Sequence, residues 1–348
     1  MIGIRIAARG KAQDVAVDVL IVGAGLSGLM AANALLERGN SVQVIDRGRS
    51  VGGRLATRRV GENGLADHGA QFFTVRTSTL QRYVDHWRSL DLAYVWGTGW
   101  SDGSLKRTIG DGHPRYAIRG GMNKLAKQLA QGIAISVDRL ISNIRQEDGG
   151  WKLYDSGGNA YAGHGLIMTP PMPESLELLT ANGVHLNADD DAALRRIRFG
   201  PCLCGIHAVN GDVDLPAPGA MQNFQSDVYW VADNQAKGIS STKIITSHAN
   251  AKFSRQNWDA SEADIIRALE SAVQPFLKPG AKIAQTQLKK WRYSVPLTTH
   301  PQECLLAQDL PPLVFAGDAF GGRGRVEGAF LSGIAAGEKM AEALASYS

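Results

Sequence analysis

The chain alternates between unbroken apolar runs and stretches in which apolar residues recur with helical spacing, a pattern typical of α/β proteins. Residues 19–22 form such a run and predict a buried strand. Apolar residues from Leu29 to Leu36 then fall on one face of a predicted helix, which ends at Gly39. Residues 41–45 predict a second strand, so this segment is predicted to be the first β-α-β unit of a parallel sheet.

The turn between this strand and helix carries glycines with G-x-G-x-x-G spacing. Such glycines allow a tight turn, let the backbone approach a pyrophosphate, and let the helix pack closely on the strand. The helix N-terminus offers free N–H groups and a partial positive charge to the phosphates. Asp46 ends the second strand, eighteen positions after the last glycine, and is placed to accept hydrogen bonds from ribose hydroxyls. The predicted dinucleotide contacts of this unit are Gly23, Gly25, Leu26, Ser27, Gly28, Asp46 and Arg47.

Later segments resume the same domain. Residues 141–154 predict a β-meander with a turn at Asp148, and residues 165–169 predict a strand stopped by two prolines. Residues 313–316 predict a buried strand that Gly317 and Asp318 end, and a helix with an apolar stripe begins near Val326. We therefore predict a Rossmann-type cofactor domain (17–77, 119–171 and 283–348), an inserted α+β substrate domain (78–118 and 172–282), and an N-terminal extension (1–16).

Composition excludes several classes of protein. The 348 residues carry a net charge of +4, and because Lys and Arg are scattered among nearly as many acids, a nucleic-acid partner is not expected. No apolar run approaches the roughly 20 residues of a membrane span, and no signal peptide is evident, so we expect a cytoplasmic protein. We expect Cys202, Cys204 and Cys304 to be buried free thiols, and no metal site.

The segment after Asp46 indicates which dinucleotide is bound. "GGRLATRR", which begins at Gly52, resembles the glycine-glycine-arginine signature of FAD-binding amine oxidase-type flavoproteins, and "DHGAQFF" from Asp67 resembles their segment beside the flavin ring. The resemblance implies FAD in a Rossmann-type domain of the glutathione reductase family 2, p-hydroxybenzoate hydroxylase-like topology. It implies that Arg54 holds a diphosphate oxygen and Asp318 the ribityl chain. The further cofactor contacts it implies are Gly53, Arg54, His68, Gly69, Ala70, Gln71, Ile141, Gly317, Asp318, Val326 and Ala329.

A narrower resemblance covers residues 17–344. "KKWRYS" from Lys289, "SRQNWDAS" from Ser254 and "GRVEGAFLSG" from Gly324 resemble bacterial renalase-like flavoproteins. The resemblance implies an FAD oxidase that converts isomeric dihydronicotinamide dinucleotides to NAD(P), with O2 reoxidising the flavin to give H2O2. The implied partners are a small-molecule substrate and O2, in a monomer or homodimer. Because aromatisation drives hydride transfer from such a donor, no protein base is needed.

The candidate substrate residues lie in the same segments. Trp291 and Phe73 are expected to form pocket walls. Arg292, Arg323 and Arg325 are expected to attract phosphates or a carboxylate. Glu327 is expected to pair with one of these arginines or to accept a bond from a carboxamide, and His248 to line the pocket. The residues assigned to catalysis are Trp291, Arg292, Arg325, Glu327 and His248.

Several interpretations stay open at this point. For each candidate substrate residue, ordinary packing or a surface ion pair is the alternative, and for His68 it is a purely structural role. An amine or amino-acid oxidase would use the same FAD motifs with an aromatic cage or an arginine clamp. A non-catalytic FAD-binding redox sensor would use them without turnover.

Overall fold

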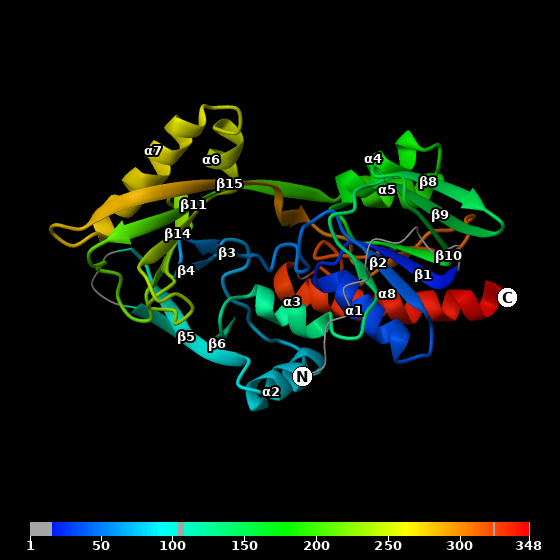
Figure 1. Ribbon diagram of the computed structural model, residues 1–348, viewed down its shortest axis with the longest axis horizontal. Helices are drawn as coiled ribbons and strands as arrows, with labels where there is room; N and C mark the ends of the chain where they lie inside the picture. The colour runs from blue at the N-terminus through cyan, green and yellow to red at the C-terminus, as the bar shows by residue number, and fades with distance from the viewer. Residues whose placement is uncertain (1–15, 104–107, 323, 348) are drawn as a thin grey trace.

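The computed structural model describes residues 16–103, 108–322 and 324–347, and Figure 1 shows its two lobes, each built on its own sheet. The lobe that holds the chain's first strand contains an eight-stranded sheet. Its strands are β1 (Val17–Val22), β2 (Val42–Ile45), β7 (Ile135–Ser136), β8 (Ile141–Glu147), β9 (Gly150–Asp155), β10 (Ala160–Met168), β16 (Leu305–Leu306) and β17 (Leu313–Phe315).

The order of the first sheet is β16-β17-β10-β1-β2-β7, and β9 pairs with β10 and carries β8 at its other edge. The strands from β17 to β7 are parallel, whereas β16 and β9 run antiparallel to their neighbours. β1 lies between two parallel partners, and its residues Val19, Leu20 and Ile21 are at most 1% exposed. The predicted first strand, second strand and meander are therefore confirmed.

Helices cover both faces of this sheet. Successive side chains of β1 point to opposite faces, so both faces are apolar and both need a covering layer. Val19 and Ile21 pack with α1 (Leu26–Leu36), α3 (Asn123–Leu129) and α8 (Arg325–Tyr347). Leu20 and Val22 pack with α4 (Met172–Ala181) and α5 (Ala188–Arg195) on the opposite face. Figure 1 shows α1 and α8 side by side.

Two glycines of α8 allow it to lie close to α1. A Cβ added at Gly333 would lie 2.4 Å from the carbonyl oxygen of Ser27, and one at Gly337 would lie 2.7 Å from that of Ala31. Real Cβ atoms do not approach backbone oxygens so closely, so both positions require glycine at this helix separation. This contact fixes the N-terminus of α8 beside that of α1.

The second lobe contains a seven-stranded sheet in the order β15-β11-β14-β13-β12-β5-β6. Helices α6 (Ala251–Gln256) and α7 (Glu262–Val273), followed by the short η1 (Gln274–Phe276), cover one of its faces. Its strands are β5 (Ala93–Ser101), β6 (Thr108–Ile118), β11 (Arg198–Asn210), β12 (Ala220–Gln222), β13 (Val228–Asp233), β14 (Ile244–Ala249) and β15 (Lys282–Thr298).

Two small elements connect the lobes. The hairpin of β3 (Thr57–Val60) and β4 (Gly64–Asp67) packs through Val60 and Ala66 against Cys204 and Ile244 of the second sheet. Helix α2 (Ser78–Ser89) contributes Trp87, whose ring lies edge-on to Phe330 of α8 with the centroids 6.1 Å apart. The lobes are thus joined by packed contacts as well as by the chain.

The predicted domain boundaries differ from this arrangement at both ends of the large insert. β15 was predicted in the cofactor domain, but it pairs along β11 in the second sheet. α4 and α5 were predicted in the substrate domain, but they pack on the first sheet. Contacts between distant segments decide which sheet β15, α4 and α5 join, and the local hydrophobic pattern does not encode these contacts. Of the predicted extension, residues 1–15 lie outside the described residues.

Three other expectations concern single residues and spans. Cys202 and Cys204 are buried free thiols as predicted, whereas Cys304 is only half-buried. None of the helices in the described ranges is both long and apolar enough to cross a membrane. The last helix begins at Arg325, one residue before the predicted position.

Candidate active site

A cleft of about 1480 Å³ lies between the two lobes and collects almost every residue singled out from the sequence. All five residues assigned to catalysis line it, and so does every predicted cofactor contact except Gly28. Gly28 instead has the predicted packing role, because a Cβ there would lie 1.9 Å from the carbonyl oxygen of Gly23. Arg323 lies outside the described residues.

One end of the cleft is a glycine cradle at the start of α1. Gly25 is the N-cap residue of this helix, and a Cβ added to it would have nothing within 4 Å. The Gly52 N–H donates to the Ala24 carbonyl at 2.8 Å, which holds the second glycine loop beside the first. A Cβ at Gly53 would lie 3.3 Å from the Cα of Gly25. The open space at Gly25, at a helix N-terminus, fits the pyrophosphate of FAD.

Asp46 stands at the end of β2, beside this cradle. Its Oδ2 accepts the N–H of Ala24 at 2.6 Å, and its Oδ1 accepts the N–H of Gly48 at 2.6 Å. The carboxylate is therefore held in a fixed orientation, with lone pairs left for a ribose hydroxyl. Arg47 forms an exposed ion pair with Glu174 of α4 at 3.0 Å, on the rim of the cleft.

The predicted diphosphate and ribityl contacts meet each other. Arg54 donates from both terminal nitrogens to the two carboxylate oxygens of Asp318, each at 2.7 Å. Burial raises the pKa of Asp318, and the charge of Arg54 opposes this shift. The sequence motifs assigned these two residues to different parts of FAD and gave no sign that they form a pair.

The segment from His68 to Gln71 forms one wall of the cleft. A Cβ at Gly69 would lie 2.0 Å from the carbonyl oxygen of Arg54, so only glycine fits there. The His68 ring stacks on Trp291 with the centroids 5.4 Å apart, and the Trp291 Nε1 donates to the His68 carbonyl at 2.8 Å. Trp291 is thus joined to the predicted flavin-facing segment.

Four residues that line the cleft each have a buried polar atom without a hydrogen-bond partner in the part of the chain that the structure describes. These atoms are Nδ1 of His68, Oε1 of Gln71, Nε1 of Trp230 and Nε2 of His248. Burial lowers the pKa of His68 to about 3, helped by the charges of Arg58 and Lys289. Burial likewise lowers the pKa of His248 to about 4. Both imidazoles are therefore neutral near pH 7, each with one donor and one acceptor nitrogen.

Aromatic side chains that the sequence analysis did not assign also line the substrate end. Phe72, Tyr229 and Trp230 lie there beside the expected Trp291 and Phe73. Phe73 is only 3% exposed and stacks on Tyr116, so most of its ring belongs to the core. Tyr229 and Trp230 lie on β13, and the sequence pattern of a single strand does not indicate which of its faces meets a cleft.

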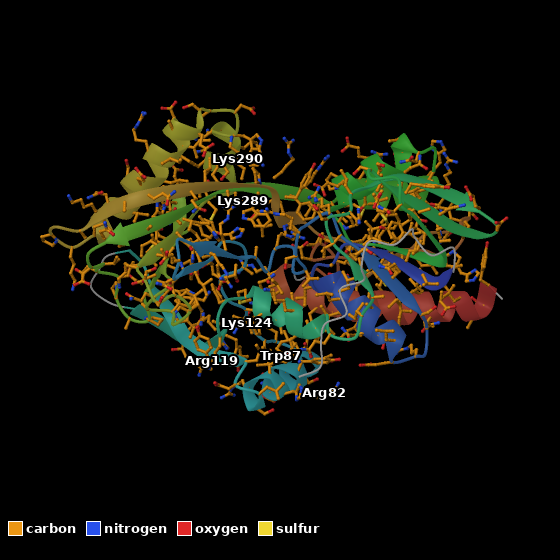
Figure 2. The ribbon with its side chains drawn as sticks, in the orientation of Figure 1. Arg82, Trp87, Arg119, Lys124, Lys289 and Lys290 are labelled. Carbon is orange, nitrogen blue, oxygen red and sulfur yellow. The ribbon has the colours of Figure 1, made fainter. Side chains whose placement is uncertain are left out.

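Cationic side chains gather at the same end, and Figure 2 shows Lys289 and Lys290 on β15. Lys289 lies 4.9 Å from the centre of the Trp291 ring, and Arg292 lies 5.5 Å from that of Trp258. Arg325 is exposed at the first position of α8, with φ +61°. Among the described residues, none of these cations forms a salt bridge with a carboxylate.

Glu327 does not have the predicted arginine partner among the described residues. Its Oε1 accepts the N–H groups of Arg76 and Thr77 at 3.0 and 2.8 Å, and the Thr77 hydroxyl at 2.8 Å. Thr77 is the N-cap residue of α2, so this buried carboxylate stabilises a helix start.

Two protein families match the sequence. A Rossmann-like NAD(P)-binding domain matches residues 21–87, and flavin-containing amine oxidoreductase matches residues 101–341, more than half of the chain. Mouse renalase is 24% identical over 326 residues, which cover 87% of this chain and 92% of renalase.

Solved structures of oxidases share the fold. A redesigned double mutant of putrescine oxidase has a TM-score of 0.70 at 14% identity, covering 94% of this chain and 99% of that one. Cyclohexylamine oxidase from Brevibacterium oxydans IH-35A has a TM-score of 0.68 at 15% identity, with coverages of 94% and 99%. A putative protoporphyrinogen oxidase from Exiguobacterium sp. 255-15 has a TM-score of 0.69 at 11% identity, with coverages of 94% and 98%.

Proposed function

Because the chain belongs to the flavin-containing amine oxidoreductase family, we propose that it is an FAD oxidase whose substrate is an isomeric dihydronicotinamide dinucleotide, as in renalase-like flavoproteins. The family makes it an FAD-dependent oxidoreductase. The similarity to renalase supports the finer statement, which names the hydride donor and NAD(P) as the product. FAD, when bound, would supply the hydride acceptor, and O2 would be the final oxidant, reduced to H2O2.

The residues of the cleft divide into a cofactor end and a substrate end. At the cofactor end, Gly25 and the start of α1 would hold the pyrophosphate, and Asp46 would hold a ribose. His68 to Gln71 would lie along the flavin. At the substrate end, Trp291 and Tyr229 provide flat apolar surfaces for a planar ring.

The observation that carries the proposal is the unpaired positive charge of the substrate end. Lys289, Arg292 and Arg325 line it without a carboxylate partner in the described chain. The nearby carboxylates are committed elsewhere, since Glu327 caps α2 and Asp318 binds Arg54. Such a surface attracts the two charges of a dinucleotide pyrophosphate and repels a protonated amine.

The chain's own part in the reaction is orientation and exclusion of water. A dihydronicotinamide becomes aromatic when it loses a hydride, so no residue has to remove a proton from it. Within the described residues, the neutral rings of His68 and His248 each carry a buried nitrogen without a hydrogen-bond partner beside the cleft. These are suited to the positioning of a polar substrate group that lacks charge, such as a carboxamide.

An amine oxidase is the second candidate function. It is supported by the family and by the fold shared with putrescine oxidase and cyclohexylamine oxidase. The aromatic rings of Tyr229, Trp230 and Trp291 suit the apolar part of an amine. An amine would have to enter a positively charged cleft, so we expect the uncharged form to be the one that binds.

The test is an anaerobic reduction screen. The FAD-loaded protein is mixed with dihydronicotinamide isomers, amines or amino acids, and the loss of flavin absorbance is followed over time. Rapid bleaching by the dihydronicotinamide isomers, with release of NAD(P), is the expected result. Bleaching by amines alone would replace the proposal with the second candidate, and no bleaching by any compound would favour a redox sensor.

A variant pair sharpens this screen. Arg325→Gln removes a cation from the substrate end, and we expect kcat/KM for the dinucleotide to fall about tenfold with FAD retained. Arg267→Gln removes a cation from an exposed ion pair on α7 and should change neither quantity. Equal effects of the two substitutions would remove Arg325 from the substrate site.

A further inference from the structure

Lys237 is a fully buried lysine that belongs to no FAD motif. It lies in the loop between β13 and β14, and its side chain has no exposed surface. Lysine is almost never buried without a partner, because transfer of its charge out of water is costly. Its partners therefore indicate what the position requires.

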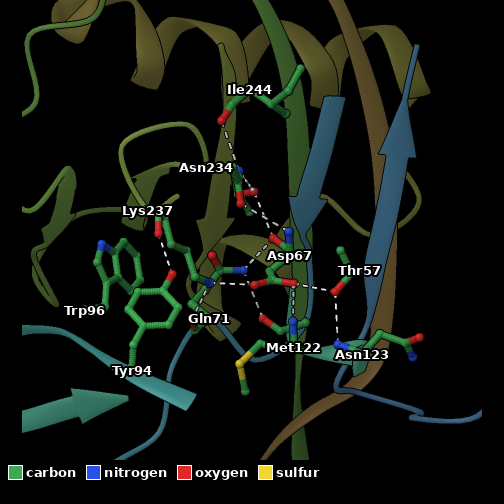
Figure 3. Close-up of polar contacts among 12 residues, drawn as sticks. Thr57, Asp67, Gln71, Tyr94, Trp96, Met122, Asn123, Asn234, Lys237 and Ile244 are labelled. Atoms are coloured by element: carbon green, nitrogen blue, oxygen red, sulfur yellow. Dashed lines mark hydrogen bonds and ion pairs between the residues drawn. The ribbon is translucent and has the colours of Figure 1, made fainter. Parts of the chain in front are cut away.

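The ammonium group of Lys237 has a partner in each of three directions, as Figure 3 shows around Asp67, Gln71 and Trp96. It donates to Oδ2 of Asp67 at 2.6 Å and to the carbonyl oxygen of Gln71 at 2.5 Å. Its nitrogen also lies 4.7 Å from the centre of the Trp96 ring. The Tyr94 hydroxyl donates to the Lys237 carbonyl, which holds the backbone of the loop in place.

Asp67 is anchored on its other side to the first lobe. Its Oδ1 accepts the Thr57 hydroxyl at 2.5 Å and the Met122 N–H at 2.8 Å, at the start of α3. Its backbone N–H donates to Oδ1 of Asn234 at 3.2 Å, in the same loop as Lys237. Asp67 thus joins the loop of the second sheet to the elements around the cofactor end.

The two acceptors of Lys237 lie at opposite ends of the segment that lines the cleft. Asp67 precedes His68, and the carbonyl of Gln71 closes the segment. Backbone bonds hold the opposite side of the segment. The Ala70 N–H donates to the Arg54 carbonyl at 2.8 Å, and the His68 N–H donates to the Ala56 carbonyl at 3.0 Å. Lys237 therefore closes a clamp around four residues that line the cleft.

Stability alone does not require this pair. Burial lowers the pKa of Lys237, and the charge of Asp67 opposes this shift. An apolar pair of similar volume is often as stable as a buried ion pair, because neither charge then has to leave water. A lysine ammonium supplies something that an apolar side chain cannot, which is simultaneous bonds to a carboxylate and a carbonyl.

We propose that Lys237 is a positioning residue that sets the placement of residues 68–71 against FAD by clamping Asp67 and Gln71 together. The inference rests on FAD binding and is independent of the substrate proposed above. It assigns to the second sheet a direct role in the shape of the cofactor site.

The test uses a double variant, Asp67→Asn with Lys237→Met, which removes both charges and leaves no buried ion unpaired. FAD affinity is measured by the quenching of FAD fluorescence, and the visible absorption bands of bound FAD report its surroundings. We expect the Kd for FAD to rise about tenfold, the effect of losing roughly one hydrogen-bonded contact, and the bands to shift, since residues 68–71 would no longer be held in one position.

Two further variants keep the test decisive. Lys243→Met breaks the neighbouring Lys243–Asp233 pair, which has a distance of 3.0 Å and lies at the end of the same loop, and should leave both measurements unchanged. Tyr94→Phe removes only the hydroxyl that holds the Lys237 backbone, and should shift the bands in the same direction by a smaller amount.

A folded double variant with the affinity and spectrum of the wild type would overturn the inference. If the double variant does not fold, an unchanged spectrum in Tyr94→Phe would also overturn it. Failure of the substrate screen, with FAD affinity changed as expected, would reject the proposed substrate and leave the role of Lys237 intact.

Discussion

Arg54 and Asp318 lie 264 positions apart in the chain and meet inside the cleft as a two-point ion pair, with both N–O distances at 2.7 Å. Arg54 follows the second glycine loop, and Asp318 follows β17. Because both N–H···O bonds are parallel and charge-assisted, the pair fixes the angle between these two loops as well as their distance. The cofactor end is therefore held in shape by bonds within the chain.

The first prediction concerns this pair. Arg54→Met leaves the Asp318 carboxylate buried without its partner, and we expect the free energy of unfolding of the FAD-free protein to fall by about 2–4 kcal/mol. The pKa of Asp318 should rise further, so the folded state holds a proton that the unfolded state has lost. The free energy of unfolding should then decrease as pH rises from the pKa of Asp318 in the unfolded state to its higher pKa in the folded state. Urea unfolding at several pH values measures both effects, and Arg38→Met, in an exposed pair with Glu338, is the control.

The second prediction distinguishes a glycine needed for FAD binding from a glycine needed for helix packing. Gly25→Ala adds a methyl group that meets no protein atom within 4 Å, so the free energy of unfolding should fall by no more than about 1 kcal/mol, the cost of alanine at an N-cap. The same methyl group occupies the cradle, so FAD affinity should fall roughly a hundredfold. Gly333→Ala is the matched contrast, because its methyl group meets Ser27 and should cost about 1–3 kcal/mol of stability. Calorimetry and FAD titration distinguish the two; normal FAD binding by Gly25→Ala would refute the cradle.

The third prediction removes Glu327 from the chemistry. Glu327→Gln weakens the bonds to the start of α2, and we expect a loss of about 1–2 kcal/mol in the free energy of unfolding. The rate of flavin reduction should stay close to that of the wild type, because Oε1 of Glu327 is hydrogen-bonded to the start of α2. Stopped-flow absorbance gives the rate. Glu342→Gln, in an exposed pair on α8, is the control, and a large loss of rate in Glu327→Gln alone would restore Glu327 to a catalytic role.

The fourth prediction concerns acid. The pKa of His248 is lowered to about 4 in the folded protein, against 6.5 for the ordinary group. Between these values the unfolded state binds more protons, so stability contributed by the neutral ring is lost as pH falls from 6.5 toward 4. Each such group contributes a slope of up to about 1.4 kcal/mol per pH unit. Urea unfolding should show a shallower slope for His248→Gln, and the same slope as wild type for the exposed His185→Gln.

Local signals in the sequence predicted the cofactor end well. The apolar run of β1, the glycine spacing after it and the acid that ends β2 are separated by few residues, so one β-α-β unit contains the whole signal. The structure confirms these elements and brings their residues to one cleft. The contacts of these residues with FAD stay predictions.

Interactions between distant segments could not be predicted in the same way. The partner of Glu327 is a helix start 250 positions away, and the partner of Lys237 lies 170 positions away. A single sequence carries no local mark of either contact. Lys237 left no distinguishing signal, since Lys243 lies in the same segment between β13 and β14 and a turn lysine on the surface has the same appearance.

The contact between α1 and α8 also has a consequence for synthesis of the protein. The Ser27 hydroxyl donates to the Ala329 carbonyl at 2.7 Å, across 302 positions, and Gly333 and Gly337 seat α8 on α1. A nascent chain that still lacks this last helix has translated its glycine cradle but left one side of α1 without its packing partner. The glycine cradle is therefore complete only once α8 has been synthesised and packed on α1, and we expect stable FAD binding to follow synthesis of residues 325–347.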